Sequence, residues 1–214
     1  MRPSPSASKE ASRAVAQRIL SYWYPYEPTA SPIQKLRAVQ QLWFAPSADR
    51  DASIREDFKQ YIDEAVDGQL DSWKDENDTG LALIILADQF TRNIYRQSAK
   101  AFAGDEVARS AASALLDRGC FDEVDYPKQM TLLLPFMHAE SLADQQRAVA
   151  LAEKAVEKIE DGDKKDAMGV VSFAVEHRNI IEKYGRFPYR NAALGRESTP
   201  AEEEFLLNGP RFGQ

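Results

Sequence analysis

The chain has 214 residues and carries 27 Lys and Arg against 34 Asp and Glu, so its formal net charge is −7. Hydrophobic residues make up 43% and charged residues 29%, which is typical of a globular protein and excludes a disordered one. The negative charge excludes a global basic field for nucleic acid but leaves a local basic patch open. The single cysteine, Cys120, excludes an internal disulfide and a cysteine-rich zinc site.

No apolar run reaches the ~18 residues of a membrane span, and the N-terminus lacks the apolar stretch of a secretory signal. We therefore expect a soluble cytoplasmic protein with neither a membrane nor a nucleic acid as partner. Residues 1–8 are rich in Ser, Pro and Ala and are expected to form a flexible segment. No linker divides residues 9–214, so they are expected to form a single domain.

The first predicted helix covers residues 9–23 and ends where Pro25 and Pro28 follow. Ser31-Pro32-Ile33-Gln34 is a capping box that predicts the start of the second helix. Ser53 heads another box, before an apolar stripe that runs to Ala65, and Gly68 is the expected C-cap. Asp78 or Thr79 is then expected to cap the most apolar segment of the chain, residues 81–87.

Asp105 is expected to open a helix that ends at Gly119. Pro127 starts the next helix, which Pro135 should kink or end. A long helix is predicted from Ser141 to about residue 159 and another over residues 165–184, stopped by Gly185. A punctuated loop then leads to Thr199-Pro200-Ala201-Glu202, the last capping box.

No stretch alternates like a strand with β-branched enrichment, so no strand is predicted. The pattern predicts an all-α array of about eight or nine antiparallel helices with short connections. The chain shows no clean period of a repeat protein.

Polar residues interrupt this pattern in three helices. The apolar segment that starts at residue 81 continues into a polar half, in which positions i, i+4 and i+8 share one face, and its polar residues are Asp88, Gln89, Arg92, Asn93 and Arg96. A buried helix cannot hold such groups without partners or water. These residues form either a structural salt-bridge network or part of a functional site.

Both histidines lie at the other two interruptions. His138 follows a buried apolar run, and its reference pKa of ~6.5 suits a general acid or base that Glu140 or another carboxylate could orient. Ser141 and Asp144, just beyond, fit a helix cap. His177 lies on the apolar face of its helix, where it is either a core histidine or an acid–base group.

The loop after Gly185 concentrates positive charge in an otherwise negative chain. Arg186, Arg190 and Arg196 fall within eleven residues, with Asn191 among them, and the first acidic residue of the loop is Glu197. Guanidinium groups bind carboxylate or phosphate, so the loop fits an anionic ligand. The alternative is that these arginines pair with the carboxylates of Asp88, Glu140 and Asp144.

Three motifs resemble those of the bacterial domain-of-unknown-function 924 family. They are Asp-Gln-Phe-x-Arg-Asn-x-x-Arg at 88–96, Leu-Pro-Phe-Met-His-x-Glu at 134–140, and Gly-Arg-Phe-Pro-x-Arg-Asn-x-x-Leu-Gly-Arg-x-Ser-Thr-Pro-x-Glu at 185–202. The resemblance also covers Ala101-Phe102 with Asp105, and it runs from about residue 19 to residue 212. It implies an all-α fold of the tetratricopeptide-repeat-like superfamily, and it supplies no established activity.

The sequence departs from the pattern of that family at several positions. Thr91 stands where the family usually has proline, so a weaker helix kink is expected there. Tyr189 stands where a histidine is common, which leaves no imidazole at that position. Ala139 and Ser141 replace a more usual Ser and Asp, which weakens the case for a carboxylate at the cap.

Two functional hypotheses follow. In the first, Arg186, Arg190 and Arg196 with Arg92 hold a small anionic ligand, and one histidine acts as acid or base; the groups expected at the site are His138, His177, Asp88, Glu140, Gln89, Arg92, Asn93, Arg96, Asp144, Arg186, Arg190, Asn191 and Arg196. In the second, the protein is a helical scaffold that binds a peptide or partner protein in a groove, and the same residues are a structural network.

A metal site built from the two histidines, Glu140 and Asp144 is a weaker hypothesis, because the chain lacks the Glu-x-x-His spacing of helical metal proteins. The sequence has no glycine-rich phosphate loop, Walker motif or dinucleotide fingerprint, so these patterns name no cofactor and leave the question open. No nucleophile is evident, since Cys120 has no histidine near it in sequence. Whether the protein is an enzyme is left open by these patterns.

Overall fold

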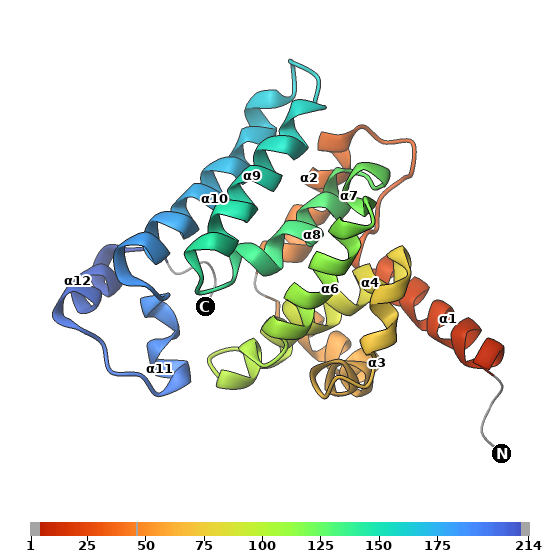
Figure 1. Cartoon of the computed structure of the whole chain (residues 1–214), viewed down its shortest axis with the longest axis horizontal. Coiled ribbons are helices and arrows are strands. Elements are labelled where there is room, and N and C mark those ends of the chain that lie inside the picture. Colours follow the sequence, from red (N-terminus) through yellow and green to blue (C-terminus); the bar gives the residue numbers. More distant parts are fainter. Residues whose placement is uncertain (1–4, 46, 211–214) are drawn as a thin grey trace.

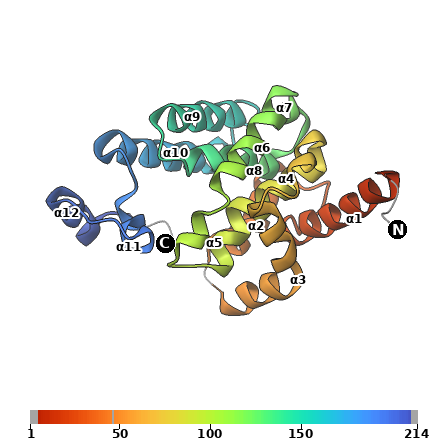
Figure 2. The same cartoon turned by 60° about the horizontal axis from the view of Figure 1, so that its bottom comes forward.

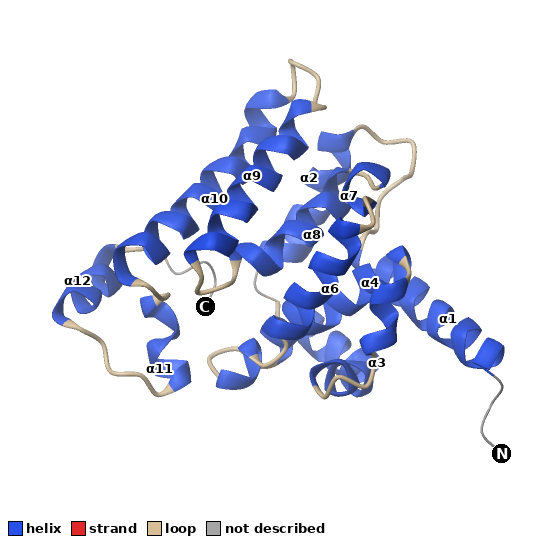
Figure 3. Cartoon of the chain, in the orientation of Figure 1, coloured by secondary structure: helices blue, strands red, loops and turns tan. Residues whose placement is uncertain are grey.

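The computed structural model describes residues 5–45 and 47–210. Within these ranges every regular element is helical and no strand occurs (Figure 3), which confirms the all-α prediction. Nine α-helices of at least eight residues account for most of the fold, namely α1 (Pro5–Trp23), α2 (Pro32–Phe44), α3 (Ala48–Val66), α4 (Asn77–Ile84), α6 (Asp105–Asp117), α8 (Tyr126–Met137), α9 (Leu142–Glu157), α10 (Lys164–Tyr184) and α12 (Pro200–Asn208).

Shorter helical turns connect these helices, and the sequence patterns did not predict them. Three are α-helical, three are 3₁₀ turns and one is a π-helical turn: α5 (Thr91–Ile94), α7 (Cys120–Glu123), α11 (Asn191–Leu194), η1 (Asp71–Asp75), η3 (Ala99–Phe102), η4 (Pro188–Arg190) and the π turn η2 (Ile85–Phe90).

The helices pack mainly as neighbours along the chain. Helices α9 and α10 form a long antiparallel pair that both views show side by side (Figures 1 and 2), and α8 packs on α9. Helix α4 lies centrally, in contact with α1 and α6, while α2 and α6 pack against α8. Helices α11 and α12 lie at the opposite end of the molecule from α1 (Figure 1). The tetratricopeptide-like arrangement stays a prediction.

Two apolar clusters lie in the interior. The larger extends along the chain from Ala16 to Ala174 and includes the fully buried rings of Trp23, Phe90 and Phe136. The smaller is formed by Ile180, Ile181 and Phe187 near the C-terminal end. Cys120 is buried in the larger cluster. The single domain expected over residues 9–214 stays a prediction.

Several predicted helix boundaries are confirmed by their hydrogen bonds. Ser31 and Gln34 bond reciprocally, with Gln34 N to Ser31 Oγ at 3.3 Å and Ser31 N to Gln34 Oε1 at 2.9 Å. Thr199 and Glu202 form the complete capping box of α12. Gly185 ends α10 with φ of 71°, a conformation that glycine adopts without steric cost.

Other boundaries differ from the predictions. Helix α1 begins at Pro5, inside the segment expected to be flexible, and residues 1–4 lie outside the described residues. Helix α3 begins at Ala48 and not at the Ser53 box, because Ser47 accepts a hydrogen bond from Arg50 N at 3.2 Å and opens the helix earlier. The helix continues through Ser53, so that box was wrong.

Helix α4 also starts earlier than predicted, at Asn77. Neither expected cap residue is the N-cap, since the hydroxyl of Thr79 donates to the carbonyl of Trp73 at 2.6 Å. Pro135 neither prevents nor immediately ends α8, which continues to Met137 with His138 as its C-cap. The site described next lies where this helix ends.

Candidate functional site

The π turn η2 interrupts the helix that runs from α4 into α5. Such turns inside α-helices are frequently found at functional sites. The hydroxyl of Thr91, the first residue of α5, donates to the carbonyl of Ala87 in the turn at 2.8 Å. The chain entering α6 touches the turn from outside, because a Cβ at Gly104 would lie 2.2 Å from the carbonyl oxygen of Ala87. This close approach requires glycine.

Asp88 lies in this π turn and is fully buried. Its Oδ1 lies 2.7 Å from His138 Nδ1 and 3.0 Å from Arg92 Nη1, and the side-chain amide of Gln89 donates to its Oδ2. Burial by itself would raise the pKa of Asp88, but the charge of Arg92 and the imidazole of His138 outweigh it and hold the pKa below its usual range. Asp88 is therefore ionised.

The tautomer of His138 follows from this contact. A carboxylate only accepts hydrogen bonds, so Nδ1 of His138 carries the hydrogen and Nε2 keeps a lone pair. Burial lowers the pKa of His138, and the opposing effect of Asp88 does not fully offset it. The imidazole is thus neutral at neutral pH. Its side chain is 16% exposed, in contrast with the 0% of Asp88, so the ring is the accessible member of the pair.

His177 lies beside His138, with the two ring centroids 6.3 Å apart. Its Nδ1 lies 2.8 Å from the carbonyl oxygen of Phe173 in the preceding turn of α10, and must therefore carry the hydrogen. Burial, followed by the neighbouring His138, lowers the pKa of His177 to about 3. Both predicted histidines are thus brought together, and both are neutral.

Further charged side chains lie around Arg92, the partner of Asp88. Arg92 binds both oxygens of Asp105, at 2.7 and 3.0 Å, and Arg190 Nη1 lies 3.5 Å from Asp105. The Arg190 guanidinium is sandwiched between Phe102 and Phe187, 4.6 and 4.5 Å from their ring centroids. Among the described residues, the buried Nε atoms of Arg92 and Arg190 have no hydrogen-bond partner.

Asp51 of α3 joins the cluster from the other side. It accepts a hydrogen bond from Asn93 at 3.0 Å and pairs with Arg96 at 2.8 Å. The charges therefore balance, because three arginines face three aspartates: Arg92, Arg96 and Arg190 with Asp51, Asp88 and Asp105.

Arg186, Arg196 and Glu140 form ion pairs that hold the C-terminal segment. Arg186 binds both oxygens of Glu202, at 2.6 and 2.8 Å. Arg196 binds both oxygens of Glu140, at 2.7 and 2.9 Å, and Glu140 also accepts from the amide of Phe187 at 2.8 Å. The charges of Arg186 and Arg196 are therefore already paired with Glu202 and Glu140.

Asn191 and Asp144 have local partners too. The amide of Asn191 donates to Ser198 at 3.0 Å, and its oxygen accepts from Arg196 at 3.0 Å. Asp144 lies 3.7 Å from Arg109, and its backbone amide donates to Ser141 at 3.3 Å. Ser141 is thus the predicted helix cap.

A cavity of about 590 Å³ opens beside the two histidines. One wall is polar and is formed by Gln89, Arg92, Asn93 and Arg96. The remaining walls come from three helices: Leu36, Gln40 and Trp43 of α2; Met130, Leu133, Leu134 and Met137 of α8, followed by His138; and Asp166, Gly169, Val170, Phe173 and His177 of α10. Six predicted site residues therefore line one cavity, and Asp88 supports one of them from behind.

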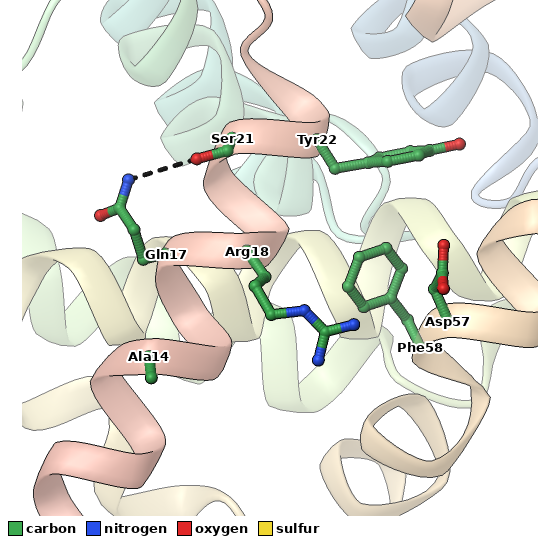
Figure 4. Close-up of a pocket in the computed structure, with 7 residues that line it drawn as sticks. All are labelled: Ala14, Gln17, Arg18, Ser21, Tyr22, Asp57 and Phe58. Atoms are coloured by element: carbon green, nitrogen blue, oxygen red, sulfur yellow. Dashed lines mark hydrogen bonds between the residues drawn. The ribbon is translucent and has the colours of Figure 1, made fainter.

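A second hollow, of about 470 Å³, lies between α1 and α3 (Figure 4). The Arg18 guanidinium lies over the Phe58 ring there, 5.7 Å from its centroid, and Gln17 donates to Ser21 at 3.3 Å. None of the predicted site residues lines this hollow, so we place the candidate site at the larger cavity.

Two general features of the described residues bear on partners. None of their helices is both long and apolar enough to cross a membrane. Their His, Cys, Asp and Glu side chains form no group of three or more arranged to hold a metal ion.

Three acidic partners were not predicted as site residues, namely Asp51, Asp105 and Glu202. Asp105 stood within a motif of the resemblance, at a helix start, which was a usable signal. Glu202 gave a signal too, because it is the last residue of the motif at 185–202 and of the last capping box. Asp51 gave none, since acidic residues in the first turn of a helix are common for reasons of helix stability alone.

Comparisons with known proteins agree with this architecture. The family model described as "Bacterial protein of unknown function (DUF924)" matches residues 19–210. A solved structure, "Structure of Protein of Unknown Function ATU0120 from Agrobacterium tumefaciens", is similar with a TM-score of 0.75 and 33% sequence identity, over 92% of this chain and 98% of that chain. No curated protein matches the chain.

Proposed function

Because the chain belongs to the DUF924 family of bacterial proteins, whose description names no activity, we propose a function from the geometry of the cavity. The cavity binds a small organic anion, with the apolar body of the ligand between α2, α8 and α10 and its charged head beside Arg92 and His138. His138, oriented by Asp88, exchanges a proton with the bound molecule.

The observation that carries this proposal is the Asp88–His138 pair at the edge of the cavity. A buried carboxylate that fixes Nδ1 of an imidazole leaves Nε2 as a proton acceptor and stabilises the imidazolium that forms. The volume of about 590 Å³ lies in the usual range for small-molecule sites. Mostly apolar walls with a few converging polar groups are also usual for such sites.

Because the charges around His138 balance, binding of an anion would leave the cluster with an excess negative charge unless a proton is also taken up. Asp88 and Arg92 face the imidazole from the π turn and α5, His177 faces it from α10, and Arg190 from η4. An added negative charge raises the pKa of a nearby imidazole. Binding of an anion should therefore be accompanied by uptake of one proton at His138, which keeps the buried cluster neutral.

Calorimetric titration with benzenesulfonate tests this proposal, because the sulfonate stays ionised throughout the pH range. We expect its affinity to fall as pH rises from about 5 to 8, by up to about tenfold per unit where one proton is taken up. The variant His138→Gln should lose this pH dependence. Glu176→Gln, which removes an exposed carboxyl on α10, is the matched control and should behave like the wild type.

Two results would contradict the proposal: no binding of benzenesulfonate by the folded protein, or a pH dependence that survives in His138→Gln. The alternative function, a helical scaffold for a peptide or partner protein, draws support from the pairing of Arg186 with Glu202 and of Arg196 with Glu140. Under that alternative the buried pairs only hold the fold together, and neither histidine influences binding.

A further inference from the structure

The cavity is elongated, which follows from the residues that α10 contributes to it. They recur at the spacing of one helix face, from Asp166 through Gly169 and Phe173 to His177. At 1.5 Å per residue, this face extends over ~16 Å. The two histidines therefore mark one end of the cavity, and Asp166 marks the other.

Contacts between helices fix the direction of this long axis. His138, at the end of α8, lies beside His177, near the end of α10. Tyr126, at the start of α8, donates to the carbonyl of Ala167, near the start of α10, at 3.2 Å. The two helices thus run in the same direction, and both pass from the far end of the cavity to the histidine end.

The section between the two ends is apolar on the described walls. Leu133 and Met137 of α8 face this section with Val170 and Phe173 of α10 and Leu36 of α2. Methionine side chains, such as that of Met137, adapt to flexible apolar ligands. Because no ionisable side chain lines this middle section, a ligand of matching chemistry carries no polar group along its middle.

The size of the cavity agrees with an extended ligand. Its volume of about 590 Å³ lies along a face that spans ~16 Å of α10. A single aliphatic chain of medium length fits within this volume along that face.

We propose that the ligand is an unbranched acyl compound of medium chain length. Its carboxyl or carboxyl-ester head lies beside His138 and Arg92, and its chain runs between α8 and α10 toward Gly169. The position of the head rests on the function proposed above, whereas the chain is inferred from the shape and walls of the cavity. The free acid and the ester share this chemistry.

Titration with butanoate, octanoate and dodecanoate, read by calorimetry on the full chain, tests the inference. Each methylene that leaves water should raise the affinity by about fourfold, until the chain exceeds the cavity. Methyl octanoate, compared with octanoate, distinguishes an ester ligand from a free acid. Tighter binding of either octanoyl compound than of its butanoyl counterpart supports an acyl chain, and no gain with length in both series overturns it.

A block inside the cavity gives the sharper test. A Cβ added at Gly169 meets no heavy atom within 4 Å, so Gly169→Phe places a ring in the cavity without a backbone clash. We expect dodecanoate to lose at least tenfold in affinity and butanoate to be unaffected. Ser172→Phe adds the same ring on an exposed position of α10 and should leave both affinities unchanged. Gly169→Leu serves if the larger variant does not fold.

The two proposals fail in different ways. Equal affinity for the three carboxylates, with the effect of His138→Gln on benzenesulfonate intact, overturns the acyl chain and leaves the proposed function standing. Length-dependent binding that Gly169→Phe abolishes, without any effect of His138, overturns the proposed function and keeps the chain. An unchanged dodecanoate affinity in folded Gly169→Phe overturns the placement of the chain.

Discussion

At the scale of single residues, Asp88 places a full negative charge where no water reaches it. A buried carboxylate is tolerated only when charged and hydrogen-bonding partners surround it. Those partners are Arg92, His138 and Gln89. All three were predicted as site residues from the sequence. The same contacts that make the carboxylate tolerable also fix the imidazole of His138.

The variant Asp88→Asn should lower the pKa of His138, because the carboxylate that favours the imidazolium is removed while the burial remains. Titration of the imidazole resonances by NMR measures this shift. Glu140→Gln removes a carboxylate that binds Arg196 instead, so it should leave the pKa of His138 unchanged. An unchanged or raised pKa in Asp88→Asn would show that Asp88 does not charge-stabilise His138.

The lowered pKa of His177 leads us to expect that the free energy of unfolding decreases in acid. Its pKa is 6.5 in an unfolded chain and about 3 in the folded one, so between these values the unfolded state binds the extra proton. The free energy of unfolding should therefore decrease as pH falls from about 6.5, by up to about 1.4 kcal/mol per pH unit from this group. Urea denaturation at several pH values measures the slope.

His177→Phe removes the titrating group and should flatten that slope relative to the wild type. Arg178→Ala, at the neighbouring half-exposed position, is the control and should keep it. If His177→Phe retained the full slope, the acid sensitivity would belong to other groups.

The sequence identified most of the polar residues that line the cavity, because buried helices with polar residues are unusual and both histidines lay in them. It did not identify their partners. Asp105 pairs with Arg92 and Arg190, and Asp51 with Asn93 and Arg96, through contacts between segments far apart in sequence. Helical spacing relates residues on one helix face only, so contacts between helices lie outside what it predicts.

At the scale of elements, the π turn η2 and the start of α6 are packed backbone to backbone at Gly104. Helix starts and stops were predictable where the cap is local, as at Ser141, Thr199 and Gly185. The π turn was not predictable, because no residue in it has a sequence preference specific to π-helices. We attribute the turn to the packing of neighbouring segments around the helix, as at Gly104. The early start of α3 after Ser47 shows that a cap residue a few positions upstream can begin the helix before the predicted one.

Gly104→Ala should lower Tm by about 5 °C, since the added methyl group cannot fit against the carbonyl of Ala87 without moving α6. Differential scanning calorimetry measures the change. Gly162→Ala is the matched control, because a Cβ there meets nothing within 4 Å. Equal Tm values for the two variants would mean that the contact at Gly104 relaxes freely.

At the scale of the whole molecule, the C-terminal segment is held differently from the rest. Residues 185–208 have only the small cluster around Phe187 for an apolar core and rely on ion pairs such as Glu140–Arg196 and Arg186–Glu202. Regions with few buried apolar contacts open at lower free energy than the main core. The same segment supplies Arg190, which reaches Asp105 behind the cavity.

Amide hydrogen exchange followed by mass spectrometry should therefore show faster exchange in α11 and α12 than in α4 and α8. Glu140→Gln should accelerate exchange in residues 186–208 by about tenfold and leave α4 unchanged. Glu153→Gln, on the exposed face of α9, is the control. Uniform protection along the chain would show that the segment and the core open together.

The buried position of Cys120 has a practical consequence. It is the only cysteine of the chain, and burial raises the pKa of its thiol to about 11. Because the thiolate is the reactive species, this side chain is nearly inert to maleimide dyes at neutral pH. A single cysteine introduced at exposed Ser172 or at Gly169 would then take up a fluorophore selectively. The native Cys120 therefore need not be replaced before site-specific labelling. The fluorescence of the attached dye could then report ligand entry into the cavity.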